Sequence, residues 1–172
     1  MGKTKIPDPA PPAAGRIWLM KSEPDVFSFD DLLAAPRRTT AWDGVRNHEV
    51  RNAMRDLMCP GDRVLFYHSN AAPPGVAGLA EIAGAARPDP TQFDPADDHH
   101  DPKSDPANPT WLMIDVRATA PLPRFVPLSD LKACPALAEM ALFKRTRLSV
   151  SFVTPEEYEA VLELAGVGKP AF

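Results

Sequence analysis

The sequence predicts a mixed α/β (α+β) fold in which several short strands form a small barrel and helices are inserted between them. Three observations lead to this prediction. Short apolar runs that end near Pro or Gly alternate with segments of helical periodicity. The chain has 172 residues, enough for one ordinary domain and too few for two comfortable ones. Hydrophobic residues make up 44% and charged residues 24%, which is typical of a globular protein with one core.

The ends of the chain differ from its middle. Residues 1–15 are rich in Pro and Ala, so we expect a disordered leader, a single domain over residues 16–166 and a short tail at 167–172. No apolar run approaches the roughly 20 residues that span a bilayer, and the N-terminus lacks the apolar region of a secretory signal. We therefore expect a soluble, intracellular (cytoplasmic, bacterial-type) monomer without a membrane partner.

Five apolar runs have the length and alternation of strands. In residues 111–119, for example, Leu112, Ile114 and Val116 share one face, while Trp111 and Met113 lie on the other. The prolines and glycines at the ends of these runs favour turns. The predicted strands are residues 17–20, 63–68, 76–86, 111–119 and 148–153.

Helical signals occupy the intervening segments. Ser28 is a suitable N-cap for a helix over residues 29–34, and Thr154 for a helix that Gly166 ends. Residues 128–141 predict one or two short helices interrupted at Pro135. Residues 46–58 give the clearest amphipathic helix. Its buried stripe is predicted to be Val50, Ala53, Met54, Leu57 and Met58.

A long loop, residues 87–110, contains six prolines, and residues 88–110 contain six Asp against one Lys. Loops of this length are functional or disordered, and the prolines favour a semi-rigid, exposed acidic flap. The run from Asp97 to Asp101 includes two histidines and resembles a set of metal ligands, but adjacent histidines rarely converge on one ion. We therefore expect no metal there. Binding of a protein partner through residues 88–110 is an alternative role.

Charge and cysteine usage narrow the function classes. The formal net charge of −4 argues against coating nucleic acid by bulk attraction. The acidic residues are concentrated in residues 88–110 and 154–165, so a local basic face is compatible with the total. Cys59 and Cys134 lie far apart and neither forms a CxxC motif, which disfavours a disulfide framework or a structural zinc site. No cofactor is predicted.

Four segments combine side chains that suit a flat, uncharged heterocycle. An extruded base needs an aromatic surface for stacking, and donors and acceptors along its edge. Trp, Ser, Asn and His supply these groups, and Arg and Lys supply phosphate contacts. The segments are WLMKSEP (18–24), WDGVRN (42–47), FYHSN (66–70) with PPGVAG (73–78), and KRTRLSV (144–150).

The chain resembles the EVE domain family of the PUA-like superfamily. The resemblance runs from about residue 17 to residue 164 and is carried by long, ordered motifs. It implies a PUA-like fold, a small curved β-barrel with helices packed outside, related to the YTH and ASCH groups. It also implies non-catalytic recognition of a modified cytosine or adenine, in DNA or RNA, flipped into a pocket. The motifs are WLMKSEPDVFSFDDL, TTAWDGVRNHEVRNAMRDLMCPGDRVLFYHSN, PPGVAGLAEI, PDPTQFDP…DPKSDP and RLSVSFVTPEEYEAVLEL.

The resemblance also implies which residues form the pocket. One wall is predicted from Lys21, Ser22 and Glu23. The other walls are predicted from Trp42, Val45, Arg46, Asn47, His68, Ser69, Asn70, Arg147, Leu148 and Ser149. The residues predicted to contact phosphate at the rim are Arg51, Arg55, Lys144 and Arg145. The chain departs from the family pattern at His48, where an aromatic residue is common, and at residues 143–146, where a more basic run is common.

Two alternatives concern Lys21 and Glu23. Some ASCH-type relatives are regarded as amidohydrolases, so these two residues are candidates for general base and acid in a small enzyme acting on a modified nucleoside. A structural alternative is that they pair with Arg46 and Asp43 and only fix the turn. A binding protein, unlike an enzyme, releases its nucleoside unchanged.

Overall fold

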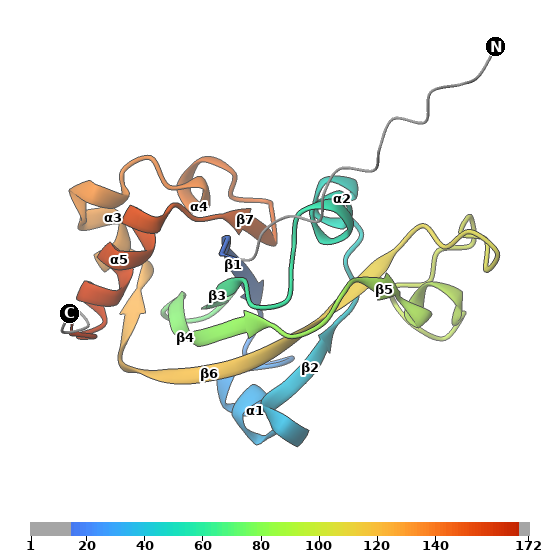
Figure 1. Ribbon diagram of the computed structural model, residues 1–172, viewed down its shortest axis with the longest axis horizontal. Coiled ribbons are helices and arrows are strands. Elements are labelled where there is room, and N and C mark those ends of the chain that lie inside the picture. The colour runs from blue at the N-terminus through green and yellow to red at the C-terminus, as the bar shows by residue number, and fades with distance from the viewer. Residues whose placement is uncertain (1–14, 169–172) are drawn as a thin grey trace, which may run out of the picture.

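The computed structural model describes residues 15–168, and a curled mixed sheet forms its centre (Figure 1). The strand order is β2-β6-β4-β3-β1-β7, and β5 pairs with β6 beside this path. β1 and β3 run parallel, whereas the other neighbouring strands are antiparallel. The strands are β1 (Ile17–Ser22), β2 (Thr39–Trp42), β3 (Arg63–His68), β4 (Gly75–Ile82), β5 (Arg87–Pro88), β6 (Leu112–Pro127) and β7 (Val150–Phe152).

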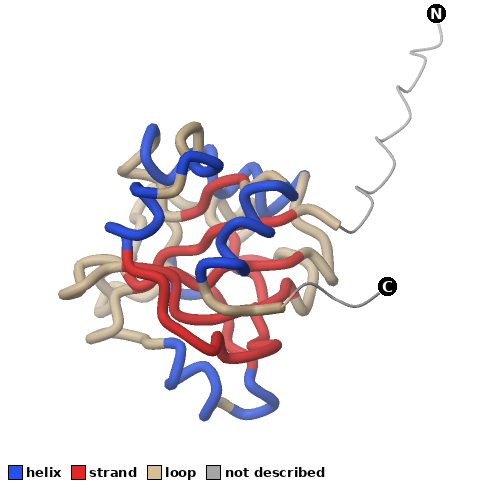
Figure 2. Tube along the Cα trace, turned by 90° about the vertical axis from the view of Figure 1, so that its left-hand side faces the viewer, coloured by secondary structure: helices blue, strands red, loops and turns tan. Residues whose placement is uncertain are grey.

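Helices lie on both sides of this sheet, as the second view shows (Figure 2). In Figure 1 α3, α4 and α5 lie together on the left, α2 lies above the sheet and α1 lies below it, and β5 with the long loop lies on the right. The α-helices of the described part are α1 (Phe29–Ala34), α2 (His48–Asp56), α3 (Leu128–Ala133), α4 (Ala141–Lys144) and α5 (Pro155–Leu164). Short 3-10 helices are η1 (Pro36–Arg38), η2 (Pro90–Phe93) and η3 (Pro135–Leu137).

Two apolar clusters fill the interior, one on each face of the central strands. Successive side chains of a strand point to opposite faces, so Phe66 of β3 enters one cluster and Leu65 and Tyr67 enter the other. Residues of α1 and α2 join the Phe66 cluster, and residues of α3 and α5 join the second cluster. The central strands are therefore buried on both faces, and ligands are accessible mainly at strand ends and loops.

Much of the predicted secondary structure is confirmed. The capping boxes at Ser28 and Thr154 begin α1 and α5, and the chain breaks at Pro135 as expected. Other predictions were wrong. The strand predicted over 76–86 ends at Ile82, and the strand predicted over 111–119 extends to Pro127. Leu57 lies beyond the end of α2 and is 39% exposed, so it does not belong to the buried stripe.

The predicted fold class is confirmed, since the protein has a mixed α/β fold around a curled sheet. Residues 1–14 of the predicted leader and residues 169–172 of the tail lie outside the described residues. Within residues 15–168 no helix is long and apolar enough to cross a membrane.

Candidate functional site

A cavity of about 650 Å³ opens where β1 and β2 end. One side, here called the strand wall, comprises lining residues of β1, the turn that follows it, β2 and Asp43. The other side, here called the loop wall, comprises Asp98 and His99 from the long loop. The strand wall consists of Lys21, Ser22, Glu23, Val26, Phe27, Thr40, Ala41, Trp42 and Asp43.

The turn after β1 is held by its own hydrogen bonds. The Ser22 hydroxyl donates to the carbonyl of Phe27 at 2.5 Å, and the Ser69 amide donates to the carbonyl of Ser22 at 3.0 Å. The side-chain amide of Asn70 donates to the Glu23 carboxylate at 2.7 Å. Ser69 and Asn70 therefore stabilise the turn through these hydrogen bonds. Both were predicted to form the pocket, but neither lines the cavity within the described residues.

His68 has a similar supporting position. Its Nε2 accepts a hydrogen bond from the Phe29 amide at 3.1 Å, which requires a neutral ring with the proton on Nδ1. Burial lowers the pKa of His68 and thereby favours this neutral form, while the charge of Asp30 opposes the shift. The structure therefore uses His68 to fix the start of α1, next to the cavity.

Trp42 supplies the aromatic surface of the cavity. It is half-buried, and its ring packs edge-on against Phe66 with the ring centroids 5.6 Å apart. Backbone pairing of Trp42 with Ile114 holds the same residue to the centre of the sheet. Because Phe66 is fully buried in the core, its contact with Trp42 fixes the orientation of the indole on the side that faces the core.

Lys21 and Glu23 both line the cavity but do not contact Arg46 or Asp43. The Lys21 ammonium donates to the carbonyl of Thr146 at 2.9 Å, and the Lys21 amide donates to the carbonyl of Ser149 at 2.8 Å. Burial lowers the pKa of Lys21. The alternative in which these two residues pair with Arg46 and Asp43 is therefore wrong. The Lys21 ammonium binds Thr146 instead, and the Glu23 carboxylate binds Asn70.

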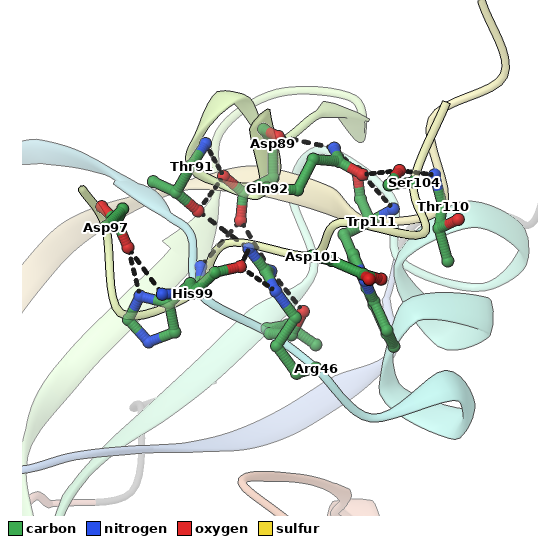
Figure 3. A network of polar contacts seen from close by, with 12 residues as sticks. Arg46, Asp89, Thr91, Gln92, Asp97, His99, Asp101, Ser104, Thr110 and Trp111 are labelled. Carbon is green, nitrogen blue, oxygen red and sulfur yellow. Dashed lines mark hydrogen bonds and ion pairs between the residues drawn. The ribbon is translucent and has the colours of Figure 1, made fainter. Parts of the chain in front are cut away.

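Arg46 joins the long loop to the strand wall (Figure 3). Its guanidinium donates twice to the carbonyl of His99, at 2.8 and 2.6 Å, and pairs with Asp89 at 3.1 Å. Asp89 is fully buried and also accepts from the Gly44 amide at 2.8 Å. Desolvation alone would raise the pKa of Asp89, but hydrogen bonds from Thr91, Gly44 and Arg46 outweigh it and lower the pKa.

A second buried residue, Gln92, organises the rest of the loop (Figure 3). Its side-chain carbonyl accepts from the Ser104 hydroxyl at 2.6 Å and from the Trp111 amide at 3.0 Å. The Trp111 indole donates to Asp101 at 2.8 Å. The predicted exposed acidic flap is therefore exposed in part only, because Asp89 and Gln92 are buried and hold the loop to the domain.

Four aspartates of this loop, exposed or half-buried, act mainly as turn residues. The carboxylate of each accepts a hydrogen bond from the amide two positions later, at 2.8 to 3.0 Å. Within residues 15–168 no three His, Cys, Asp or Glu side chains converge as metal ligands. The aspartates in these turns are Asp94, Asp97, Asp101 and Asp105.

Four other predicted pocket residues lie outside the lining of this cavity. Val45 is buried in the core, and Asn47 caps α2 by accepting from the Val50 amide at 3.1 Å. Leu148 lines a second cavity of about 660 Å³, which has a largely apolar lining that includes Trp18, Leu57 and Phe152. Ser149 contributes its backbone carbonyl to Lys21, as described above.

The predicted phosphate contacts already have partners within the chain. Arg145 binds Glu49 through two hydrogen bonds, at 2.8 and 2.7 Å, and Lys144 pairs with Glu139. Arg55 pairs with Asp56. Arg51, which is half-buried, donates to the carbonyl of Thr110 and to Asn52.

Three exposed arginines near the cavity have no side-chain partner within residues 15–168. Arg147 directly follows Thr146, whose carbonyl binds Lys21. Arg37 and Arg38 directly precede β2, and both have φ of 53°, a conformation that is unfavourable for residues other than glycine. Arg37 and Arg38 were not among the predicted site residues, although they lie five and four residues before Trp42 in the sequence.

The protein is thus a small mixed α/β domain whose curled sheet presents an aromatic ring and several polar groups to a cavity at the ends of two strands. The chain belongs to the EVE domain family, because the model of that family matches residues 16–164. The prediction of the family is thereby confirmed.

Similar proteins include thymocyte nuclear protein 1 from Homo sapiens, 44% identical over 164 residues that cover 86% of this chain and 72% of the relative. A solved structure of a hypothetical protein from Leishmania major has a TM-score of 0.83 and 45% identity, covering 88% of this chain and 95% of that chain. The human THYN1 protein in complex with DNA containing 5-methylcytosine has a TM-score of 0.85 and 43% identity, covering 91% of this chain and 100% of that chain.

Proposed function

We propose that this protein binds DNA or RNA through a modified base, which flips out of the strand and enters the cavity between the strand wall and the loop wall. The observation that carries the proposal is the half-buried indole of Trp42, fixed by Phe66 and exposed to the cavity. The complex of the human THYN1 protein with 5-methylcytosine DNA supports the same class of ligand. A modified cytosine is therefore the first candidate, and a modified adenine is the second.

In such a site, selectivity between bases depends more on shape and on matched polar groups than on burial of a methyl group. Stacking of a base on Trp42 contributes about 1–3 kcal/mol and is tolerant of base identity. Burial of one added methyl group contributes on the order of 1 kcal/mol. Discrimination then depends on polar groups that the wrong base leaves without partners. Thr40 and Asp43, which line the cavity, are the candidates for that role.

Phosphate binding is assigned to the arginines that have no internal partner. Arg37 and Arg38 lie before β2, and Arg147 lies beside the segment that contacts Lys21. Arg145, by contrast, would have to release Glu49 before it contacts a phosphate. The sugar–phosphate backbone on either side of the flipped base is therefore expected to contact Arg37 and Arg38 on one side and Arg147 on the other.

A non-catalytic role is preferred over the hydrolase alternative because Lys21 and Glu23 are both engaged in structural hydrogen bonds. The cellular compartment stays a prediction: the sequence favoured the cytoplasm, while the animal relatives are named as nuclear proteins. The monomeric state likewise stays a prediction.

The proposal is tested by fluorescence polarisation with matched DNA and RNA oligonucleotides. They carry cytosine, 5-methylcytosine, 5-hydroxymethylcytosine, adenine or N6-methyladenine at one position. We expect tighter binding to one modified base, reduced about tenfold or more by Trp42→Ala and unchanged by Leu57→Ser, which alters the second cavity. Trp42→Phe, which preserves an aromatic contact with Phe66, separates loss of stacking area from loss of folding.

Equal binding of every oligonucleotide by the wild type contradicts the proposal. An incubation with the free modified nucleosides then tests the alternative enzyme. Hydrolysis by the wild type that is absent in Lys21→Ala would establish the amidohydrolase-like function instead.

A further inference from the structure

Asp43 occupies a defined position beside the aromatic surface. It directly follows Trp42 and lines the cavity, and its amide donates to the carbonyl of Ala41 at 3.1 Å. The next amide, that of Gly44, is held by the buried Asp89 at 2.8 Å. Hydrogen bonds on both sides therefore fix the backbone that carries the Asp43 carboxyl group.

The carboxyl group of Asp43 is available to a ligand. Within residues 15–168 it has no hydrogen bond or ion pair with another side chain, and the residue is exposed. Glu23, which lines the same cavity, is bound by Asn70 instead. Asp98, at the tip of the loop wall, is the other lining carboxylate without such a partner in this part of the chain.

The surroundings of Asp43 raise the pKa of its carboxyl group above that of an ordinary aspartate. Desolvation raises the pKa of the Asp43 carboxyl, and the negative charges of Asp89 and Asp97 add to this effect, while His99 opposes it. A ligand that presents a hydrogen-bond acceptor to this group therefore meets a carboxyl that gains a proton more readily than an ordinary aspartate.

The protonation state of a carboxyl group decides which base edge it matches. An ionised carboxylate offers two acceptors and suits guanine, whose N1–H and N2–H are both donors. A carboxyl that holds or shares a proton offers one acceptor and one donor. That pair suits cytosine, whose N4 amino group donates and whose ring N3 accepts, and adenine has the same pattern. Thymine presents O4, which is an acceptor, beside N3–H, and a carboxyl can turn to offer its donor to O4. O4 is much less basic than the ring nitrogen of cytosine or adenine, however, so it shares the proton of the carboxyl less readily.

We propose that Asp43 reads the Watson–Crick edge of the flipped base and selects a base that has an amino group beside a ring-nitrogen acceptor. In this arrangement one Asp43 oxygen accepts from the exocyclic amine, and the other shares a proton with the ring nitrogen. The inference rests on the proposed function and specifies its ligand class: modified cytosine or adenine is accepted, and thymine, uracil and guanine are rejected.

The test compares 5-methylcytosine with thymine, which carry the same 5-methyl group and differ only at N3 and position 4. Each base is placed opposite an abasic nucleotide in the same DNA duplex, so that neither must break a base pair to flip. Affinities are measured for the wild type, Asp43→Asn, Asp43→Ala and Asp98→Asn, and thermal unfolding confirms that each variant folds. Asp98→Asn is the matched control, because it removes the other partnerless carboxylate of the cavity.

We expect the wild type to bind 5-methylcytosine about tenfold more tightly than thymine. Asp98→Asn is expected to keep this ratio of affinities, whatever its absolute affinity for either base. Asp43→Asn is expected to keep 5-methylcytosine binding within a few fold and to gain thymine binding, because a side-chain amide can rotate to match either edge. Asp43→Ala is expected to lose about tenfold in affinity for 5-methylcytosine. A merely structural role for Asp43 would not exchange one base preference for another.

An unchanged preference in both Asp43 variants overturns the inference, and so does a preference lost in Asp98→Asn instead. Failure of the proposed function gives a different result. In that case the wild type does not distinguish 5-methylcytosine from unmodified cytosine, whichever residue occupies position 43.

Discussion

The strand wall and the loop wall enclose one cavity but are stabilised by different interactions. The strand wall continues the central sheet: Trp42 pairs with Ile114 and packs on Phe66, which is fully buried. The loop wall depends on a buried polar network, in which Arg46 and Gln92 hold segments that have little apolar contact with the core.

Because the two walls are stabilised differently, we expect mutations to destabilise them in different ways. Apolar packing is distributed over many contacts, so a conservative change in the strand wall is shared by its neighbours. A buried polar network loses stability abruptly when one member is removed, because its partners are left desolvated and unpaired. Variants of the network should therefore release the loop wall while the strand wall stays folded.

The largest expected effect follows from Asp89→Ala. This change removes a fully buried carboxylate that binds Arg46, Gly44 and Thr91, and we expect the free energy of unfolding to fall by about 3 kcal/mol. Chemical denaturation measures the loss. Asp89→Asn, which keeps one acceptor oxygen, should lose less, and a loss below about 1 kcal/mol in Asp89→Ala would contradict the importance of the network.

A smaller effect is expected at the point where the two walls meet. Gly44 has φ of +74°, and a Cβ atom there would lie 2.8 Å from Nε2 of His99. Gly44→Ala should therefore destabilise the protein by about 1–2 kcal/mol through backbone strain and displacement of His99. Gly168→Ala is the control, since nothing lies within 4 Å of its Cβ position. Equal unfolding midpoints for the two variants would contradict the close packing at Gly44.

Arg46→Lys tests whether the loop wall can loosen while the strand wall stays folded. It keeps the positive charge but removes the planar guanidinium group. A lysine cannot reproduce the two bonds to the His99 carbonyl together with those to Asp89 and Thr91, so a loss of about 1 kcal/mol is expected. Hydrogen exchange should accelerate at the Asp101 amide, which donates to Gln92 in the loop. The Ser69 amide, which donates to Ser22 behind the strand wall, is the internal reference. Equal acceleration at both amides would show that the walls are one unit.

Acidification should weaken the loop wall gradually. The pKa of Asp89 is lowered in the folded protein, so its contribution is complete above the ordinary aspartate pKa of about 4. That contribution is lost as the pH falls through the lower, folded-state value. The difference in unfolding free energy between the wild type and Asp89→Asn should therefore shrink in this range, and a difference that grows on acidification would contradict the assignment.

The strand wall could be predicted from the sequence to a large extent. Lys21, Ser22, Glu23 and Trp42 were predicted to form the pocket, and the structure places all four in the cavity lining. Their location follows from local signals, namely the apolar run before Lys21 and the family motif around Trp42. Whether they contact a ligand stays a prediction.

The loop wall could not be predicted in the same way. Asp97 to Asp101 read as an exposed acidic run, because nothing local shows that Asp89 and Gln92 are buried by Arg46 and Trp111. These contacts join segments far apart in the chain, and polar networks have no periodicity that a sequence reveals. The partners of Arg145 and Arg55 were missed for a related reason, since ion pairs depend on the final surface geometry.

The most direct test of the account uses the three tryptophans as reporters of three regions. The Trp42 residue lines the cavity, and the Trp111 indole binds Asp101 in the loop. Trp18 lines the second cavity, and its indole donates to the buried Asp62. Proton–nitrogen NMR spectra follow the three indole signals during titration with an oligonucleotide that carries 5-methylcytosine. We predict a large shift for Trp42, a smaller one for Trp111 and none for Trp18. A shift confined to Trp18, with Trp42 unmoved, would contradict the assignment of the base to this cavity.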